Sequence, residues 1–199
     1  RMLSWYDYLT DSGGQAEDEL GAASLEETRA RLVALLDEEL GRLRDRPLEA
    51  APRGEQAESR LLVGGCSQGC GVALDAALAY PVQLGGFVGV VGHPLSCTPL
   101  GRHLDMPLHF FSGAKDKVMR WSWVGPSIEA LRRAGYANVV VHGPLPGVHH
   151  VVSRQQEADW IREAVRDCVG ESLGGGPDAP RFHRDPGPGV QNPSEFAGG

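Results

Sequence analysis

The sequence lacks several features that mark other classes of protein. No apolar run approaches the roughly 20 residues of a membrane-spanning helix, and the opening residues carry Asp7 and Asp11 where a secretion signal needs an apolar core. Acidic residues outnumber basic ones by 26 to 19, a net charge of -7, which argues against nucleic acid or an anionic membrane surface as the main partner. We expect a soluble globular protein, because 199 residues suffice for one domain with a sizeable core.

Cysteine is scarce as well. The four cysteines are Cys66, Cys70, Cys97 and Cys168, and they form no paired framework of the kind that staples small secreted domains. Cys66 and Cys70 stand four residues apart, as in half of a zinc site, but no second pair follows at ligand spacing. We therefore expect small, buried, apolar packing rather than metal binding for all four, and a reducing compartment such as the cytoplasm.

A glycine-rich turn between a strand pattern and a helix pattern is the most informative stretch. Residues 61–63 predict a short buried strand and residues 72–77 predict a helix. Between them, Gly65, Ser67 and Gly69 form a G-x-S-x-G nucleophile elbow, in which a serine stands at the tip of a sharp turn and the glycines let strand and helix approach closely. The amino end of the following helix would face a developing oxyanion. Ser67 is thus the candidate nucleophile.

Other interpretations of this turn are weaker. Glycine and serine also gather in ordinary turns, but here the match falls where a strand hands over to a helix, which is the context that the motif requires. A phosphate-binding loop would need Lys-Ser or Lys-Thr after Gly69, and residues 69–74 lack the third glycine of a dinucleotide fingerprint.

The remaining chain alternates strand and helix patterns. Ser24 and Glu27 predict a capping box that opens an amphipathic helix, and Pro47, Pro52 and Gly54 mark a surface loop over 46–59. Apolar runs predict strands at 84–91, 108–111 and 138–141, and helices are expected at 126–134, with Pro126 in its first turn, and from Ser153 onward. The first helix should bury one face made of leucines: Leu25, Leu32, Leu36, Leu40 and Leu43. The last helix should bury a stripe made of Ala158, Ile161, Val165 and Cys168.

This alternation defines the expected fold class. Strands that are apolar on both faces belong to a parallel sheet covered on both sides, so the chain predicts an α/β fold. Residues 170–199 are different, because thirteen of these thirty positions are glycine or proline and few are large and apolar. We expect them to form a disordered tail.

A nucleophilic serine needs a base and an acid, and in α/β-hydrolases these follow the serine in the order acid, then base. Asp116 comes directly after the strand at 108–111, although between Lys115 and Lys117 it is equally well interpreted as a solvated loop charge. His149 and His150 follow the strand at 138–141. The other five histidines lie within strands, before the acid or in the tail: His93, His103, His109, His142 and His183. Chemistry alone does not choose between His149 and His150.

These motifs together resemble the acyl-protein thioesterase, lysophospholipase and carboxylesterase family of α/β-hydrolases. The matching stretches run from about residue 4 to about residue 169: Ser4-Trp5-Tyr6-Asp7, Gly64 to Gly69, Ser112 to Asp116, and Gly147 to Ser153. The resemblance implies a three-layer sandwich over residues 1–169, with Ser67 as nucleophile, Asp116 as acid, His150 rather than His149 as base, and the Gln68 amide as an oxyanion donor. It also implies no cofactor, and acylated proteins, lysophospholipids or small esters as substrates. A homodimer is compatible with it.

The sequence departs from the family pattern in two ways. Lys117 stands where the family usually has proline, and the several strands and the His-Gly loop that precede the Trp-Tyr-Asp segment in the family have no counterpart before Arg1. We therefore expect a hydrolase fold truncated at its amino terminus, and the alternative function is an impaired hydrolase-like domain that binds a partner. Trp5, Trp121 and Trp123 are candidates for lining an acyl groove, although aromatic residues near a sheet more often serve packing.

Overall fold

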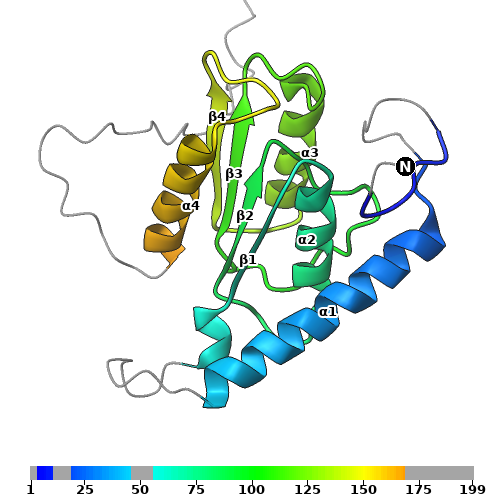
Figure 1. The fold of residues 1–199 in the computed structure, drawn as a ribbon, viewed down its shortest axis with the longest axis vertical. Coiled ribbons are helices and arrows are strands. Elements are labelled where there is room, and N and C mark those ends of the chain that lie inside the picture. Colours follow the sequence, from blue (N-terminus) through cyan, green and yellow to red (C-terminus); the bar gives the residue numbers. More distant parts are fainter. Residues whose placement is uncertain (1–3, 11–18, 46–55, 169–199) are drawn as a thin grey trace, which may run out of the picture.

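A computed structural model of the chain describes residues 4–10, 19–45 and 56–168, and a four-stranded parallel sheet forms its centre (Figure 1). The strands are β1 (Leu62–Cys66), β2 (Gly86–Val90), β3 (Leu108–Gly113) and β4 (Val139–Leu145), and they lie side by side in chain order. Since all four run in the same direction, their carboxyl ends meet at one edge of the sheet. The α/β class and the parallel sheet expected from the apolar runs are both confirmed.

Helices cover both faces of the sheet. The described helices are α1 (Ala22–Asp45), the short 3-10 helix η1 (Ala57–Arg60), α2 (Gln68–Ala79), α3 (Trp121–Arg133) and α4 (Arg154–Cys168). Figure 1 shows α2 and α3 on one face and α4 on the other, with the long α1 lying across the outside of α2. The result is the three-layer arrangement that the resemblance implied.

The core against the central strands has two parts, one on each face of the sheet, because side chains alternate along each strand. Phe87 of β2 and Phe110 of β3 point toward α2 and α3, with their ring centroids 5.4 Å apart. Val90 and Phe111 point the other way and pack under Trp160 of α4. Burial on both faces explains why the central strands read as continuous apolar runs.

The start of the first helix differs from the prediction. It begins at Ala22, so Ser24 lies inside it and is not the cap of a capping box. The Ser24 hydroxyl donates to the carbonyl of Gly21 at 2.9 Å and accepts from the amide of Asp7 at 3.0 Å. A tertiary contact with the preceding segment thus takes the place of the predicted local one.

The third helix also begins earlier than predicted. It starts at Trp121, so Pro126 falls within the helix and not in its first turn. The buried face formed by Val124, Ile128 and Leu131 continues across the proline. Packing on the sheet therefore outweighs the backbone hydrogen bond that proline cannot donate.

The last helix presents a different face from the one predicted. Ser153 does cap it, since its hydroxyl accepts from the amide of Gln156 at 3.2 Å. The buried positions, however, are Trp160 and Ala164, and Ile161 is exposed. The indole of Trp160, stacked on Phe111, decides which face turns inward. The predicted tail at 170–199 and most of the predicted loop at 46–59 lie outside the described residues.

Candidate active site

The candidate nucleophile stands alone between β1 and α2. Ser67 has φ 54° and ψ -124°, a conformation that L residues rarely adopt and that typically costs about 1–3 kcal/mol. Its amide donates to the carbonyl of Val90 at 2.9 Å, and its carbonyl accepts from Cys70 at 3.0 Å. These two hydrogen bonds, to the neighbouring strand and from the first turn of α2, fix the elbow at the carboxyl edge of the sheet.

The glycines of the motif have separate steric reasons. A Cβ atom on Gly65 would lie 2.2 Å from the carbonyl oxygen of Gly69, which no side chain tolerates. A Cβ atom on Gly69 would lie 3.1 Å from the indole nitrogen of Trp5. The first glycine thus allows the sharp turn, and the second leaves room for an aromatic ring from the segment near the start of the chain.

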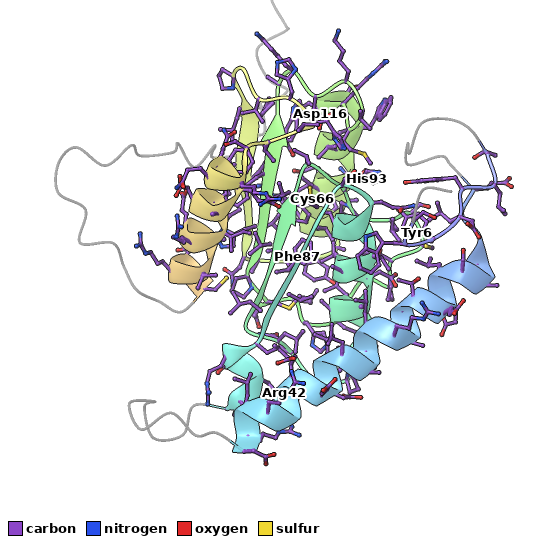
Figure 2. All side chains as sticks on the ribbon, in the orientation of Figure 1. Tyr6, Arg42, Cys66, Phe87, His93 and Asp116 are labelled. Atoms are coloured by element: carbon purple, nitrogen blue, oxygen red, sulfur yellow. The ribbon has the colours of Figure 1, made fainter. Side chains whose placement is uncertain are left out.

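Asp116 is buried, so its interpretation as a solvated loop charge is wrong. One oxygen, Oδ1, accepts from the amides of Val118 and Met119, both at 2.8 Å, and only 1% of the side chain is exposed. Figure 2 shows Asp116 at the same end of the sheet as Cys66, which precedes the elbow. These two amides fix the carboxylate and leave Oδ2 to face a partner.

His150 joins the acid to the serine. Its Nδ1 lies 3.0 Å from Oδ2 of Asp116, and its Nε2 lies 2.9 Å from Oγ of Ser67. The loops that carry the two residues are tied together by bonds from Ala114 to Leu145 and from Lys115 to Val148, at 2.9 and 2.8 Å. The structure therefore brings together three side chains that stand 83 and 34 positions apart in the sequence.

Of the two candidate histidines, only His150 bridges Ser67 and Asp116. Its side chain is 23% exposed, whereas His149 is an exposed residue beside it. A serine, an imidazole and a buried carboxylate in a hydrogen-bonded line can move a proton away from the hydroxyl, because the carboxylate fixes the tautomer and stabilises the imidazolium.

Gln68 is the first residue of α2. Its amide belongs to the first turn, where backbone N–H groups have no acceptor within the helix and the helix dipole is positive. The side chain makes two contacts that the sequence did not predict: Oε1 accepts from the amide of Trp5 and Nε2 donates to the carbonyl of Tyr6, each at 2.9 Å. The sequence offered one signal for these contacts, namely that the Trp-Tyr-Asp segment and the elbow glutamine occur together.

One cysteine, Cys66, directly precedes the candidate nucleophile. Partial burial, followed by the carboxylates of Glu157 and Asp116, raises the pKa of the Cys66 thiol, so Cys66 is protonated at neutral pH. All four cysteines are free, but Cys66 and Cys97 are exposed, which corrects the prediction of buried packing for all of them. Within the described part of the chain, no group of three or more histidine, cysteine or carboxylate side chains is arranged to hold a metal ion.

The three tryptophans considered for an acyl groove occupy different environments. Trp5 is 52% exposed and lies on the first turn of α2. Trp121 and Trp123 begin α3 and are half-buried, with the guanidinium of Arg120 5.2 Å from the ring centroid of Trp123. Trp5 is therefore the one that contacts the elbow.

In the described residues, no helix is both long and apolar enough to cross a membrane.

Comparisons with solved structures agree with this fold. The SOBER1 protein of Arabidopsis thaliana superposes with a TM-score of 0.63 at 21% identity, over 83% of this chain and 74% of that one. Acyl-protein thioesterase 2 of Zea mays gives a TM-score of 0.58 at 21% identity, over 81% and 72%. These likenesses, together with the three layers and the elbow, define the α/β-hydrolase fold.

Sequence comparison narrows the class. A model of the phospholipase/carboxylesterase family matches residues 1–139. Acyl-protein thioesterase 1 of Yarrowia lipolytica is 28% identical over 177 residues, which cover 84% of this chain and 71% of the relative. Its namesake in Schizosaccharomyces pombe is 35% identical over 92 residues, 46% of this chain and 34% of the relative. The chain belongs to the phospholipase/carboxylesterase family, whose reaction class is the hydrolysis of esters or thioesters.

Proposed function

We propose that the protein is a serine hydrolase that cleaves acyl thioesters or esters through an acyl-enzyme. One observation carries the proposal: the hydrogen-bonded line from Oγ of Ser67 through the imidazole of His150 to Oδ2 of Asp116. Ser67 is the nucleophile, His150 the base and Asp116 the acid of a catalytic triad. Along the chain they follow the order serine, acid, histidine, as in α/β-hydrolases. Family membership supports the same reaction class.

In the first half of the reaction, Nε2 of His150 takes the proton of Ser67 as Oγ attacks the acyl carbonyl carbon. A new C–O bond forms, the carbonyl electron pair moves to oxygen, and the Gln68 amide donates to the resulting oxyanion. When the oxyanion collapses, the bond to the thiol or alcohol breaks. The imidazolium returns the proton to this leaving group, and Asp116 stays ionised throughout.

Water completes the cycle by the same steps. His150 removes a proton from water, the hydroxide attacks the acyl carbonyl of the ester on Ser67, and a second oxyanion forms at the Gln68 amide. Its collapse breaks the bond to Oγ, which regains a proton from His150, and a carboxylic acid leaves. No step needs a metal or an organic cofactor.

For the substrate, we propose the acyl thioester of an S-acylated protein, with lysophospholipids and short esters as the alternatives within the same chemistry. The names of the curated relatives support the first of these. A cytoplasmic enzyme would meet such substrates, and four free thiols are compatible with a reducing compartment.

A fluorophosphonate probe tests the nucleophile directly. The wild-type protein should be labelled on the peptide that contains Ser67, and Ser67→Ala should not be labelled. Ser59→Ala is the matched control, since Ser59 lies in η1 at the other end of β1 and should leave labelling unchanged. Absence of labelling in folded wild-type protein would refute the hydrolase and favour a domain that only binds a partner.

Initial rates then separate the substrate classes. A palmitoylated peptide thioester, a lysophosphatidylcholine and p-nitrophenyl acetate can be compared on the same preparation, with Ser67→Ala as the blank. The proposal expects the highest kcat/KM for the thioester. Turnover of the acetate ester alone would reassign the enzyme to short soluble esters.

A further inference from the structure

The carboxamide of Gln68 has both of its ends engaged by one short segment. Oε1 accepts from the amide of Trp5, and Nε2 donates to the carbonyl of Tyr6. A glutamine suits this place because it offers an acceptor and a donor on one planar group. A glutamate would turn a second acceptor toward the Tyr6 carbonyl, and a leucine would offer neither function.

The segment that Gln68 holds is also fixed by α1. The Thr28 hydroxyl donates to the carbonyl of Trp5, and the Ser24 hydroxyl accepts from the amide of Asp7. The ring of Tyr6 is buried in a small cluster with Leu25 of α1 and with Val72 and Leu95. Figure 2 shows Tyr6 between α2 and the beginning of α1.

One side chain of this segment, that of Trp5, is only partly buried. The indole of Trp5 lies on the first turn of α2, against Gly69, and half of the residue stays exposed. Gly69 is two positions after the nucleophile, so a large apolar surface stands beside the residues that would hold the scissile carbonyl. An exposed aromatic face beside a polar reaction centre, on a backbone fixed by hydrogen bonds, suits an alkyl chain, because covering it removes apolar area from water.

We propose that Trp5 forms a wall for the acyl chain of the substrate and that the Gln68 carboxamide is the positioning residue that holds this wall beside Ser67. The inference rests on the proposed function, because it names a surface for the acyl part of that substrate. It also gives the elbow glutamine two separable roles, with the backbone amide serving the oxyanion and the side chain serving acyl recognition.

Fluorine NMR of fluorotryptophan-labelled protein tests the clamp without any activity. The resonance missing in Trp5→Phe identifies Trp5, and the one missing in Trp160→Phe identifies Trp160. In Gln68→Glu and Gln68→Leu, the Trp5 signal should move toward the position of the unfolded protein and narrow. Gln155→Glu is the matched control, since Gln155 is an exposed glutamine on α4, and it should leave the Trp5 signal in place.

Trp160, which is buried against Phe111, reports in the same spectra whether each variant is folded. If Gln68→Leu loses the dispersed Trp160 signal, the isosteric Gln68→Glu carries the test. A Trp5 signal that does not change in folded Gln68 variants would overturn the clamp.

Ligand addition tests the wall. Decanoate, added to the wild-type protein, should shift the Trp5 signal and leave that of Trp160 unchanged. An unshifted Trp5 signal at saturating decanoate would overturn the acyl wall even if the enzyme is active. Because neither NMR readout requires turnover, failure of the proposed hydrolase reaction and failure of this inference are distinguishable.

Chain-length selectivity gives the kinetic test. The ratio of kcat/KM for p-nitrophenyl decanoate to that for the acetate should fall about tenfold in Trp5→Ala, as expected when about two methylene groups lose apolar cover at ~0.8 kcal/mol each. Trp5→Phe should keep most of the ratio. Gln68→Leu should lower it as Trp5→Ala does, and the double variant should lower it no further. If Gln68→Leu slows both esters equally, the carboxamide does not act through Trp5 and the proposal fails.

Discussion

His150 and His142 stand eight positions apart in the sequence, yet their surroundings are opposite. The imidazole of His150 lies beyond the end of β4, partly exposed, with a buried carboxylate on Nδ1 and a hydroxyl on Nε2. That of His142 lies within β4, with its Nε2 3.1 Å from Nδ1 of His109 and its ring stacked on Phe111 at a centroid distance of 4.1 Å. A carboxylate oxygen of Glu163 lies 3.7 Å from Nδ1 of His142.

Burial and the neighbouring His109 lower the pKa of His142 to about 4, and the more distant carboxylate of Asp167 opposes this only in part. His142 is therefore neutral across the physiological range. The comparison teaches that position relative to the end of a strand decides what a histidine does: inside the strand it lies between sheet and helix, and beyond the strand it can meet groups from other loops.

The largest expected effect is on the histidine outside the strand. His150→Asn should lower kcat/KM by roughly 10⁵-fold, since the general base and the serine act as a unit. His149→Asn should stay within about twofold of wild type, the range that 0.4 kcal/mol covers, because the neighbouring exposed imidazole does not bridge Ser67 and Asp116. Steady-state rates on the best ester decide the matter. Equal losses in both variants would contradict the assignment of the base.

Two carboxylates, Asp116 beside His150 and Asp167 beside the His109–His142 pair, should differ as strongly. Asp116→Asn should lower kcat by about 10⁴-fold, because the amide no longer enforces the required tautomer of His150. Asp167→Asn removes a carboxylate 3.3 Å from Nε2 of His109 and should leave the rate near that of wild type. Circular dichroism on both variants controls for folding. A wild-type rate in Asp116→Asn would remove the acid from the mechanism.

The pH dependence of the unfolding free energy should test the buried histidine, His142. Because the pKa of folded His142 lies below its ordinary value of 6.5, the unfolded chain binds this proton more readily, so the stability contributed by the neutral ring is complete above about pH 6.5 and is lost as the pH falls toward about 4. This group should remove about 1–2 kcal/mol of unfolding free energy between pH 6.5 and pH 5. Urea unfolding at the two pH values measures it.

His142→Phe should reduce that acid loss, because phenylalanine can stack on Phe111 without titrating. His149→Asn is the matched histidine substitution and should leave the acid loss as in wild type. An equal pH dependence in His142→Phe and wild type would show that the buried ring is not the group responsible.

The smallest effect concerns the helix that follows His150. The Ser153 hydroxyl accepts from the amide of Gln156 and caps α4, so Ser153→Ala should lower the unfolding free energy by about 1 kcal/mol. The exposed Ser122 provides the matched control in Ser122→Ala, with a change within ~0.5 kcal/mol. Chemical denaturation measures both. If Ser153→Ala is as stable as wild type, α4 is held by Trp160 and Ala164 alone.

The residues that could be predicted are those whose reasons are local. The elbow follows from a strand, a serine between glycines and a helix, and the parallel sheet follows from runs such as 108–111 that are apolar on both faces. The order of Asp116 and His150 along the chain was enough to nominate them. Choosing His150 over His149 required resemblance to a family, because both occupy the same loop.

Errors arose where tertiary contacts replaced local ones. Ser24 has the sequence of a helix cap, but its hydroxyl contacts the backbone of Asp7 and Gly21. For Asp116 the sequence left a solvated charge as an equal alternative to the acid, and the two amides that contact its carboxylate exclude that alternative. The buried face of α4 was wrong by a rotation, because the stacking partner of Trp160 lies on a distant strand.

The sequence by itself determined the strained turn around Ser67, since this turn depends on the glycines at positions 65 and 69 that flank it. Only the tertiary structure decided which groups surround this serine. They are the hydrogen-bonded line to His150 and Asp116 and the hydrogen bonds from the Gln68 side chain to the backbone of Trp5 and Tyr6. The physical reason is distance along the chain. A hydrogen bond between residues 83 positions apart leaves no periodicity in the sequence, and it exists only once the sheet has brought its strand ends together.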